Sequence, residues 1–308
     1  MKSILEAGDL KGKRVLVRVD WSVPMKDGKV RNDYQIKVTL PTLEYLKEVG
    51  AKVTVVTHLE STDDSIDALR GYLPEGIELL PNLRENPGEQ ANSEEFVQKL
   101  VSGADIYVNE AFAVSHRSHA SIVGVPRLLP GFAGLHFVEE VKQLSRAFSP
   151  SHPFLLILGG AKIETKLALV EKFSALADSI FIGGAMATKA YGVGLGNNPK
   201  IFFPTGDLSA LDANDETLEI LKKKINEAKF VLWNGPLGKY EDGHTQYTYE
   251  LAQALSSSEA EVIVGGGDTL SAIEGLSVLD KFSFVSTGGG AMLEFLATGT
   301  LPGIQALK

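Results

Sequence analysis

Residues 154–166 read FLLILGGAKIETK, an apolar run followed by two glycines and two lysines. A short apolar run that ends in glycines is typical of a buried strand, and the residues after the turn indicate the start of a helix. Lys162 and Lys166 are four residues apart, a spacing that would place both on one face at the start of that helix. Two cations at the positive end of a helix favour a bound anion. This segment therefore predicts a phosphate site.

The same order of apolar strand and glycine turn recurs at residues 179–184, 261–267 and 282–290. A single glycine cluster is more often a tight turn than a ligand site, because glycine reaches φ > 0 without steric cost. Repeated clusters at equivalent strand ends favour a ligand platform, since ligands of parallel sheets bind at the carboxyl ends of the strands. Neither the dinucleotide spacing nor the P-loop spacing is met, so we expect a mononucleotide site of another kind.

The first half of the chain alternates strands and helices in the same way. Strands are predicted at 14–20, 51–57, 77–80 and 105–108, and helices at 40–46, 93–101 and 137–148. Pro150 and Pro153 follow the last of these helices and indicate a domain boundary. We therefore expect an α/β protein with a doubly wound parallel sheet in each of two domains, residues 1–149 and 150–290.

The composition excludes several classes of function. The 308 residues carry 30 Lys and Arg against 39 Asp and Glu, a net charge of −9, which argues against nucleic acid or an anionic membrane surface as partner. The chain contains no cysteine, which excludes disulfides and thiolate chemistry and is typical of a reducing compartment. No signal sequence or membrane span is visible, so we expect a cytoplasmic protein that binds small molecules.

Two acidic residues in the second half each have a structural and a functional interpretation. Asp268, with Thr269, follows three glycines, where it would serve as a helix N-cap or as a ligand of Mg²⁺ beside phosphate oxygens. Glu241 would accept hydrogen bonds from ribose hydroxyls, although an isolated acid is more often a surface residue. The residues alone leave both pairs of alternatives open.

Polar residues also follow three strands of the first half. Asp20 and Ser22 end the first strand, His58 ends the second, and Arg117 comes after the fourth. A lone histidine or arginine is usually packed or solvated, but three strand ends that deliver polar groups to one rim favour an anion site. Two domains with an anion site each suggest transfer between two phosphorylated molecules.

Nearly the whole chain resembles the phosphoglycerate kinase family. The resemblance is carried by residues 17–20 (VRVD), 82–84 (NLR), 87–89 (PGE), 107–112 (YVNEAF), 115–121 (SHRSHAS), 158–162 (LGGAK), 233–238 (WNGPLG), 265–269 (GGGDT), 286–291 (STGGGA) and 301–304 (LPGI). It implies two Rossmann-like domains joined by a helical hinge, with a C-terminal tail, residues 291–308, that returns to the first domain. It also implies a monomer that reversibly transfers the acyl phosphate of 1,3-bisphosphoglycerate to ADP with Mg²⁺.

By this resemblance the candidate residues take particular roles. Lys162 would hold the migrating phosphoryl group, and Gly288, Gly289 and Gly290 would donate N–H groups to it. The nucleotide site would comprise Lys166 at the phosphates, Gly183 and Gly184 at the adenine, Glu241 at the ribose, and Gly266, Gly267, Asp268 and Thr269, with Asp268 as the magnesium ligand. The phosphoglycerate site would comprise Asp20, Ser22, Gln35, His58, Arg117 and His152.

The sequence departs from the family pattern mainly in the phosphoglycerate site. Gln35, Ser61 and His152 stand where the resemblance leads us to expect arginines, and Glu60 stands where it leads us to expect glycine. Ser22 likewise replaces an expected asparagine, and Arg117 is the one basic residue of the clamp that remains. Loss of an arginine that stabilises a transferring phosphoryl group costs roughly 10³–10⁵ in rate.

The chain also looks shorter than family members, with segments missing after Leu59 and between Gly196 and Leu218. The leading hypothesis is a reduced phosphoglycerate kinase. The alternatives are a nucleotide-binding homologue with impaired catalysis and a kinase of a different carboxylate.

Overall fold

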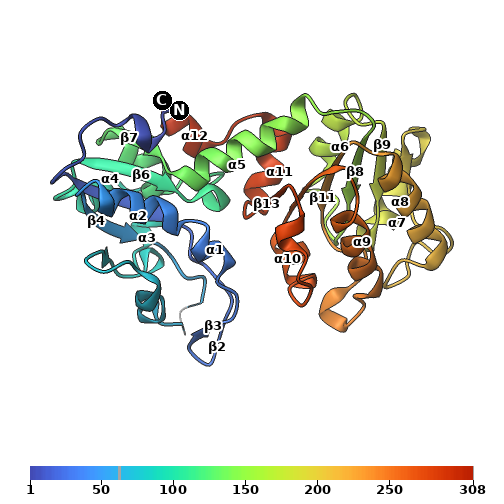
Figure 1. Cartoon of the computed structure of the whole chain (residues 1–308), viewed down its shortest axis with the longest axis horizontal. Helices are drawn as coiled ribbons and strands as arrows, with labels where there is room; N and C mark the ends of the chain where they lie inside the picture. Colours follow the sequence, from blue (N-terminus) through green and yellow to red (C-terminus); the bar gives the residue numbers. More distant parts are fainter. Residues whose placement is uncertain (62–63, 308) are drawn as a thin grey trace. The chain divides into compact units, whose positions relative to one another are not determined.

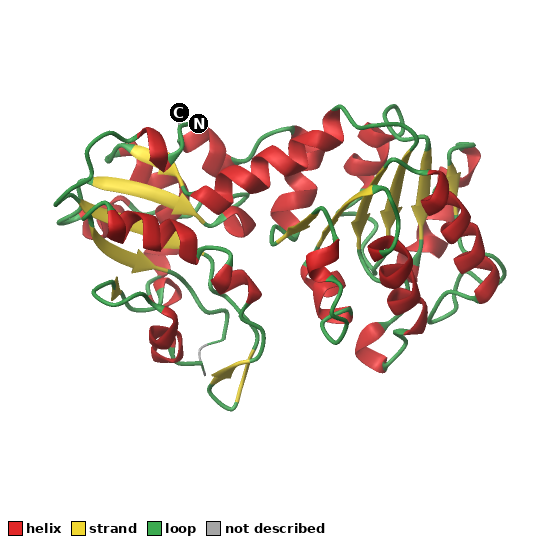
Figure 2. Cartoon of the chain, in the orientation of Figure 1, coloured by secondary structure: helices red, strands yellow, loops and turns green. Residues whose placement is uncertain are grey.

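The computed structural model of the chain describes residues 1–61 and 64–307. These residues form two compact units, one made of residues 1–142 with the C-terminal segment from Thr300, and one from Gln143 to Gly299. Each unit contains a parallel sheet with helices packed around it (Figure 1, Figure 2). The predicted α/β class, with a parallel sheet in each of two domains, is confirmed.

The first unit is built on a sheet with the strand order β5-β4-β1-β6-β7, in which every neighbouring pair is parallel. Its elements are β1 (Arg14–Val19), β2 (Met25–Lys26), β3 (Lys29–Val30), α1 (Tyr34–Lys37), α2 (Leu40–Glu48), β4 (Lys52–Val56), β5 (Glu78–Leu79), α3 (Pro87–Gln90), α4 (Glu94–Val101), β6 (Ile106–Glu110), β7 (Gly131–Ala133), the main part of α5 (Leu135–Ser145) and α12 (Pro302–Ala306). The chain moves outward from β1 to β4 and β5, then returns to place β6 on the other side of β1. Ligands of such sheets bind beyond the carboxyl ends of the strands where the order reverses, which here places Asp20 at the switch point.

The second unit has the order β10-β9-β8-β11-β12-β13, again parallel throughout. Its elements are β8 (Phe154–Leu158), α6 (Leu167–Phe173), β9 (Ser179–Ile182), α7 (Ala187–Gly192), β10 (Ile201–Phe202), α8 (Asp215–Glu227), β11 (Phe230–Asn234), α9 (Gln246–Ser256), β12 (Glu261–Gly265), α10 (Gly267–Ala272), β13 (Phe284–Ser286) and α11 (Gly290–Thr298). The switch point of this sheet lies between β8 and β11. The first glycine turn, Gly159-Gly160, follows β8 at that point.

Continuous apolar strands hold the second sheet in place. Every residue of β8 is buried, as expected for a strand covered on both faces. The ring of Phe154 packs edge to face on Phe173 of α6 and Phe230 of β11, with centroid distances of 5.8 and 5.1 Å. These contacts fix β8 between its neighbours and therefore fix the turn that follows it.

The division between the units differs from the expected boundary at residue 149. It falls between Lys142 and Gln143, inside α5, because the 3-10 turn that follows this helix, Arg146–Phe148, packs on the second unit. Arg146 forms an ion pair with Glu261 at 2.5 Å, and the ring of Phe148 lies 5.7 Å from that of Phe295.

The C-terminal segment that belongs to the first unit starts at Thr300 and not at residue 291. Helix α11 packs against α6 and therefore belongs to the second unit. The following residues contact the first unit, where the N–H of Gly303 donates to the carbonyl of Ser115 at 2.8 Å. None of the helices within residues 1–61 and 64–307 combines the length and apolar character needed to cross a bilayer.

Candidate active site

A cavity of about 400 Å³ lies at the carboxyl ends of β8, β11 and β12 in the second unit. It occupies the switch point of this sheet, where ligands of doubly wound folds bind. Its lining includes most of the residues that the sequence singled out in this half: Lys162, Lys166, Glu241, Gly266, Gly267, Asp268, Thr269, Gly289 and Gly290. Gly183, Gly184 and Gly288 are not part of this lining.

Those three glycines are engaged by the protein itself. The N–H of Gly183 donates to Leu158 at 2.8 Å, and a Cβ on Gly184 would lie only 2.6 Å from the backbone nitrogen of Gly160. Gly184 therefore allows the close approach of two turns. The N–H of Gly288 donates to Oγ of Ser286 at 3.0 Å.

Lys166 is the buried cation of the cavity. Its Nζ donates to the carbonyls of Gly159 at 2.5 Å and Asn234 at 3.4 Å, at the ends of β8 and β11. Burial lowers the pKa of Lys166 to about 8, although the charge of Asp268 opposes that shift. The ammonium group therefore joins the two central strand ends and lacks an anionic partner at close range among the described contacts.

Lys162 differs from Lys166 in its environment because its side chain is exposed. The prediction that the two lysines share one face at the start of a helix is wrong, because α6 begins only at Leu167 and both lysines precede it. Residues 163–166 form a turn in which the N–H of Lys166 donates to Ile163 at 2.8 Å. Both lysines nevertheless line the same cavity.

Asp268 is the second residue of α10, and the structure decides against its interpretation as the N-cap. The N-cap is Gly266, and no side chain caps this helix. The carboxylate of Asp268 is exposed toward the cavity and accepts a hydrogen bond from the hydroxyl of Tyr240 at 3.4 Å. Within the part of the chain that the structure describes, no group of three His, Asp or Glu side chains could hold a metal by itself. A lone carboxylate beside an anion cavity fits Mg²⁺, which proteins usually hold through one or two carboxylates and substrate phosphates.

Gly266 and Thr269 shape the loop that carries Asp268. Gly266 has φ +106°, and a Cβ there would lie 2.8 Å from Nδ2 of Asn234. The buried hydroxyl of Thr269 accepts from the N–H of Gly235 at 2.7 Å and donates to the carbonyl of Gly265 at 3.0 Å. Thr269 therefore ties the ends of β11 and β12 together.

A second cavity of about 310 Å³ adjoins the first in the same unit. The two share Gly160, Ala161, Glu241 and Asp268 in their linings. The second cavity is bordered mainly by small and apolar residues, namely Ala185, Leu208, Ala210, Leu211, Pro236 and Gly238 with Tyr240. A polar compartment beside an apolar one suits a nucleotide, whose phosphates and base need different surroundings. Sequence reasoning missed residues 208–211, which give no periodic signal.

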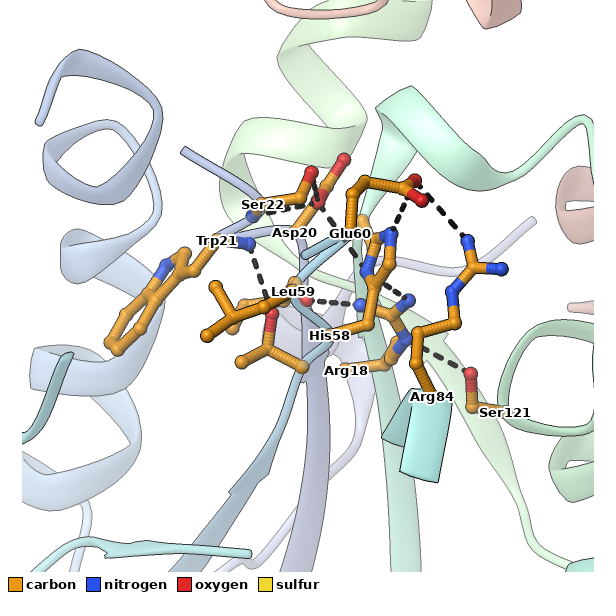
Figure 3. A network of polar contacts seen from close by, with 12 residues as sticks. Arg18, Asp20, Trp21, Ser22, His58, Leu59, Glu60, Arg84 and Ser121 are labelled. Atoms are coloured by element: carbon orange, nitrogen blue, oxygen red, sulfur yellow. Dashed lines mark hydrogen bonds and ion pairs between the residues drawn. The ribbon is translucent and has the colours of Figure 1, made fainter. Parts of the chain in front are cut away.

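The first unit places a buried arginine at the carboxyl end of β1. Arg18 is 1% exposed, and each nitrogen of its guanidinium has a partner (Figure 3). Nε donates to Oγ of Ser121 at 2.9 Å, Nη1 to the carbonyl of Val19, and Nη2 lies 3.1 Å from Nδ1 of His58. Ser121 in turn donates its hydroxyl to the buried carboxylate of Glu89 at 2.5 Å. This network fixes both arginine and histidine.

His58, at the end of β4, is neutral. Burial, together with the positive charges of Arg18 and Arg84, lowers the pKa of His58 to about 3. Nδ1 therefore accepts from Arg18, and Nε2 carries the proton and donates to Oε1 of Glu60 at 3.3 Å. Asp20 lies 3.7 Å from Nδ1, but two acceptors do not bond. Asp20 instead accepts the hydroxyl of Ser22 at 2.6 Å.

Glu60 also contacts two further cations of this site, Arg84 and Arg117. Its Oε1 lies 3.3 Å from Nη2 of Arg84 and 3.4 Å from Nη1 of Arg117. Figure 3 shows Glu60 between His58 and Arg84. The structure thus adds Arg18 and Arg84 to the site, so the statement that Arg117 is the one basic residue there is wrong. Arg18 and Arg84 lie in the segments VRVD and NLR, but the sequence alone did not show that these two segments approach each other in the fold.

Two other predicted residues have no described hydrogen bond or ion pair with this cluster. His152 belongs to the second unit, where it precedes β8 at the amino ends of the strands and its Nδ1 lies 2.6 Å from Asp178. The contacts of His152 within the second unit do not test whether it joins Asp20 and His58, which stays a prediction. Gln35 is half-buried on α1, and the described contacts include no hydrogen bond from it to the cluster.

The fold and the two sites define the class of the protein: a two-domain α/β protein with a nucleotide-type cavity on one sheet and a cationic site on the other. The model of the family "Phosphoglycerate kinase" matches residues 5–73, 63–200 and 197–299. The chain therefore belongs to the phosphoglycerate kinase family and is a phosphoglycerate kinase-like phosphotransferase.

The relatives found by sequence and by structure are phosphoglycerate kinases as well. The phosphoglycerate kinase of Dictyoglomus turgidum is 35% identical, covering 100% of this chain and 99% of its own, and that of Thermus thermophilus is 34% identical, covering 100% of both. The solved phosphoglycerate kinase of Coxiella burnetii superposes with a TM-score of 0.84 at 30% identity, covering 99% of this chain and 98% of its own. That of Pyrococcus horikoshii OT3 superposes with a TM-score of 0.85 at 28% identity, covering 100% and 98%.

The comparisons also bear on the predicted shortening. The alignment with the Dictyoglomus turgidum relative extends over 391 positions, more than the 308 residues of this chain. The matched segments of the family meet at residues 63–73 and 197–200, close to the two places where segments are predicted to be missing. The chain is therefore shorter than this relative.

Proposed function

We propose that the chain transfers a phosphoryl group reversibly between the γ-phosphate of ATP and the carboxylate of 3-phosphoglycerate. The observation that carries this proposal is the cavity at the switch point of the second sheet, where Lys166 and Asp268 face the same space. The adjoining apolar cavity would take the base, and Glu241, which borders both, would accept from the ribose. The cationic cluster of the first unit, with Asp20 and Ser22, would bind the phosphoglycerate.

The reaction requires that the two substrates are positioned and that the negative charge of the transferring phosphoryl group is neutralised. In the direction that consumes ATP, an acceptor carboxylate oxygen bonds to the γ-phosphorus while the bond from that phosphorus to the bridging oxygen breaks, and the electron pair leaves with ADP. A carboxylate is already a nucleophile, so no general base is required. Fixed cations and N–H donors then stabilise the charge on the transferring group.

Residues of the second unit would supply those groups. Lys166 would bind the nucleotide phosphates and Lys162 the transferring phosphoryl group, with N–H donation from Gly289 and Gly290 in the lining. Because the N–H of Gly288 already has a partner in Ser286, we assign it a lesser part. Asp268 would hold Mg²⁺, which supplies positive charge beside the phosphates when bound. Because the two ligands would bind to different units, transfer requires the two bound molecules to meet.

A coupled assay tests the proposal. Purified chain, MgATP and 3-phosphoglycerate at millimolar concentration should give turnover that depends on both substrates. Lys162→Ala is the matched control, because this exposed lysine can be removed without opening a core. Turnover no greater than that of the control would contradict the proposal.

We also propose that the chain acts in the cytoplasm as a monomer. The lack of cysteine supports a reducing compartment. Light scattering on the purified protein should give a mass near 33.1 kDa, and twice that mass would contradict the monomer.

A further inference from the structure

One carboxylate of this chain sits inside its own cationic site. Oε1 of Glu60 is 3.3 Å from Nε2 of His58, 3.3 Å from Nη2 of Arg84 and 3.4 Å from Nη1 of Arg117. All three contacts reach a single oxygen. Convergence of a neutral N–H donor and two guanidinium groups on one oxygen is the arrangement that binds an oxygen of a phosphate or a carboxylate.

The innermost donor of the site, His58, is held independently of Glu60. His58 is held by Arg18, which Ser121 and Val19 hold in turn. The side chain of His58 is 1% exposed and that of Arg84 13%, whereas that of Glu60 is 60% exposed. His58 is therefore preorganised in the protein and Arg84 is largely enclosed by it, and Glu60 reaches them from the solvent side.

The contacts of Glu60 are longer than is usual between charged groups. Charge-assisted N–H···O bonds are usually about 2.7–2.9 Å long, and those of Glu60 are 3.3 to 3.4 Å. Burial alone would raise the pKa of Glu60, but the charges of Arg84 and Arg117 and the hydrogen bond from His58 lower it, so its carboxylate is ionised in place. A mostly exposed side chain with long contacts can leave the site at little cost.

We propose that Glu60 is an internal competing anion that determines which substrates this site accepts. Its carboxylate occupies the position on His58, Arg84 and Arg117 that an oxygen of an anionic substrate takes, and the side chain leaves when that substrate binds. The class of ligand is a phosphorylated carboxylate, so the proposal rests on the proposed function of this unit. Glu60 thereby lowers the affinity for every oxyanion and favours substrates with a second anionic group to displace it.

The test is a pair of charge-removing substitutions. Glu60→Gln keeps the size of the side chain and removes the competing charge. Glu85→Gln is the control, because Glu85 is an exposed acid next to Arg84 and has no described side-chain contact with the cluster. Both variants change the net charge by one, so a difference between them isolates the local contact from the overall field.

Calorimetry would measure the dissociation constants of 3-phosphoglycerate, inorganic phosphate and MgADP for both variants and the wild type. We expect Glu60→Gln to bind 3-phosphoglycerate and phosphate about tenfold more tightly, which is about 1.4 kcal/mol. Glu85→Gln should change either affinity less than twofold. MgADP, which would bind the other unit, should bind all three proteins alike, and the midpoint of thermal unfolding should stay within a few degrees.

The outcomes separate this proposal from the function on which it rests. If phosphate binds more tightly to Glu60→Gln than to the wild type while 3-phosphoglycerate binds neither of them, the role of Glu60 as a competing anion is supported and the proposed substrate is wrong. If 3-phosphoglycerate binds but Glu60→Gln leaves its affinity unchanged or weaker, the substrate stands and the competing anion is wrong. Equal tightening by Glu85→Gln, or no binding of any anion to either protein, would also overturn the role of Glu60.

Discussion

Nη2 of Arg18 lies 3.1 Å from Nδ1 of His58, and both side chains are almost fully buried. The guanidinium cannot lose its proton, so the imidazole must be the acceptor and is held in a single tautomer. The contact joins β1 to the end of β4, the two strands whose carboxyl ends form the cationic site. The Arg18–His58 contact therefore supports both the fold of the first unit and the geometry of its cationic site.

Replacement of His58 by leucine should destabilise the first unit. The substitution leaves an N–H of the buried Arg18 without its partner, which costs about 1–3 kcal/mol in the free energy of unfolding. His58→Gln should cost less, because an amide oxygen can accept the same hydrogen bond. Urea unfolding followed by the fluorescence of the buried Trp21, in a Trp233→Phe background, measures both. Equal stability of His58→Leu and His58→Gln would contradict the role of the contact.

The affinity for nucleotide should fall as the pH rises above 8. An anion favours the ammonium form of Lys166, whose pKa in the free protein burial lowers to about 8. The contribution of this charge is therefore full below pH 8 and is lost above it, by no more than about tenfold per pH unit. Calorimetric titration of MgADP between pH 7 and pH 9.5 tests this.

Lys166→Arg is the control for that titration, because arginine stays charged throughout this range. Its affinity for MgADP, whatever its absolute value, should not vary with pH. A parallel fall in the wild type and the variant would assign the pH dependence to another group.

The sequence predicted the fold class because the central strands are uninterrupted apolar runs that end in glycines. It missed β7 and β10, which contain three and two residues and owe their pairing to the neighbouring strand more than to any pattern of their own. It also placed the start of α6 too early, since lysines are compatible with both a helix and the turn that precedes it. The local sequence pattern therefore predicts the central strands and helices well, but it predicts poorly where each element begins and ends.

The two sites differ in how far the sequence could predict them. The nucleotide-type cavity is made of strand ends and the turns that follow them, so Lys166 and Asp268 could be placed together from topology alone. The cationic site also needs Arg84, which a short 3-10 turn carries, and Glu60, which only the folded chain brings to it.

Gly266→Ala should weaken the nucleotide-type cavity. The residue has φ +106°, and its Cβ would come within 2.8 Å of Nδ2 of Asn234, which donates to Gly265 at 2.9 Å. Strain of this kind costs about 1–3 kcal/mol and displaces the loop that carries Asp268. We expect a lower stability of the second unit and weaker binding of MgADP. Gly275→Ala is the matched control, since its Cβ would meet nothing within 4 Å, and an equal loss in both variants would contradict the prediction.

Gln35→Arg should raise the rate of phosphoryl transfer. By the family resemblance, this position carries an arginine that stabilises the transferring group, and loss of such a residue costs roughly 10³–10⁵ in rate. Gln35 is half-buried on α1, and the longer side chain breaks no described hydrogen bond. We expect kcat to rise at least tenfold in the coupled assay, with little change in the KM for MgATP, because the new charge acts on the transition state more than on the bound nucleotide. Gln98→Arg makes the same chemical change at an exposed position of α4, outside both sites, and should leave kcat unaltered. A Gln35→Arg enzyme no faster than this control would mean that the remaining residues of the site, and Glu60 above all, limit the reaction.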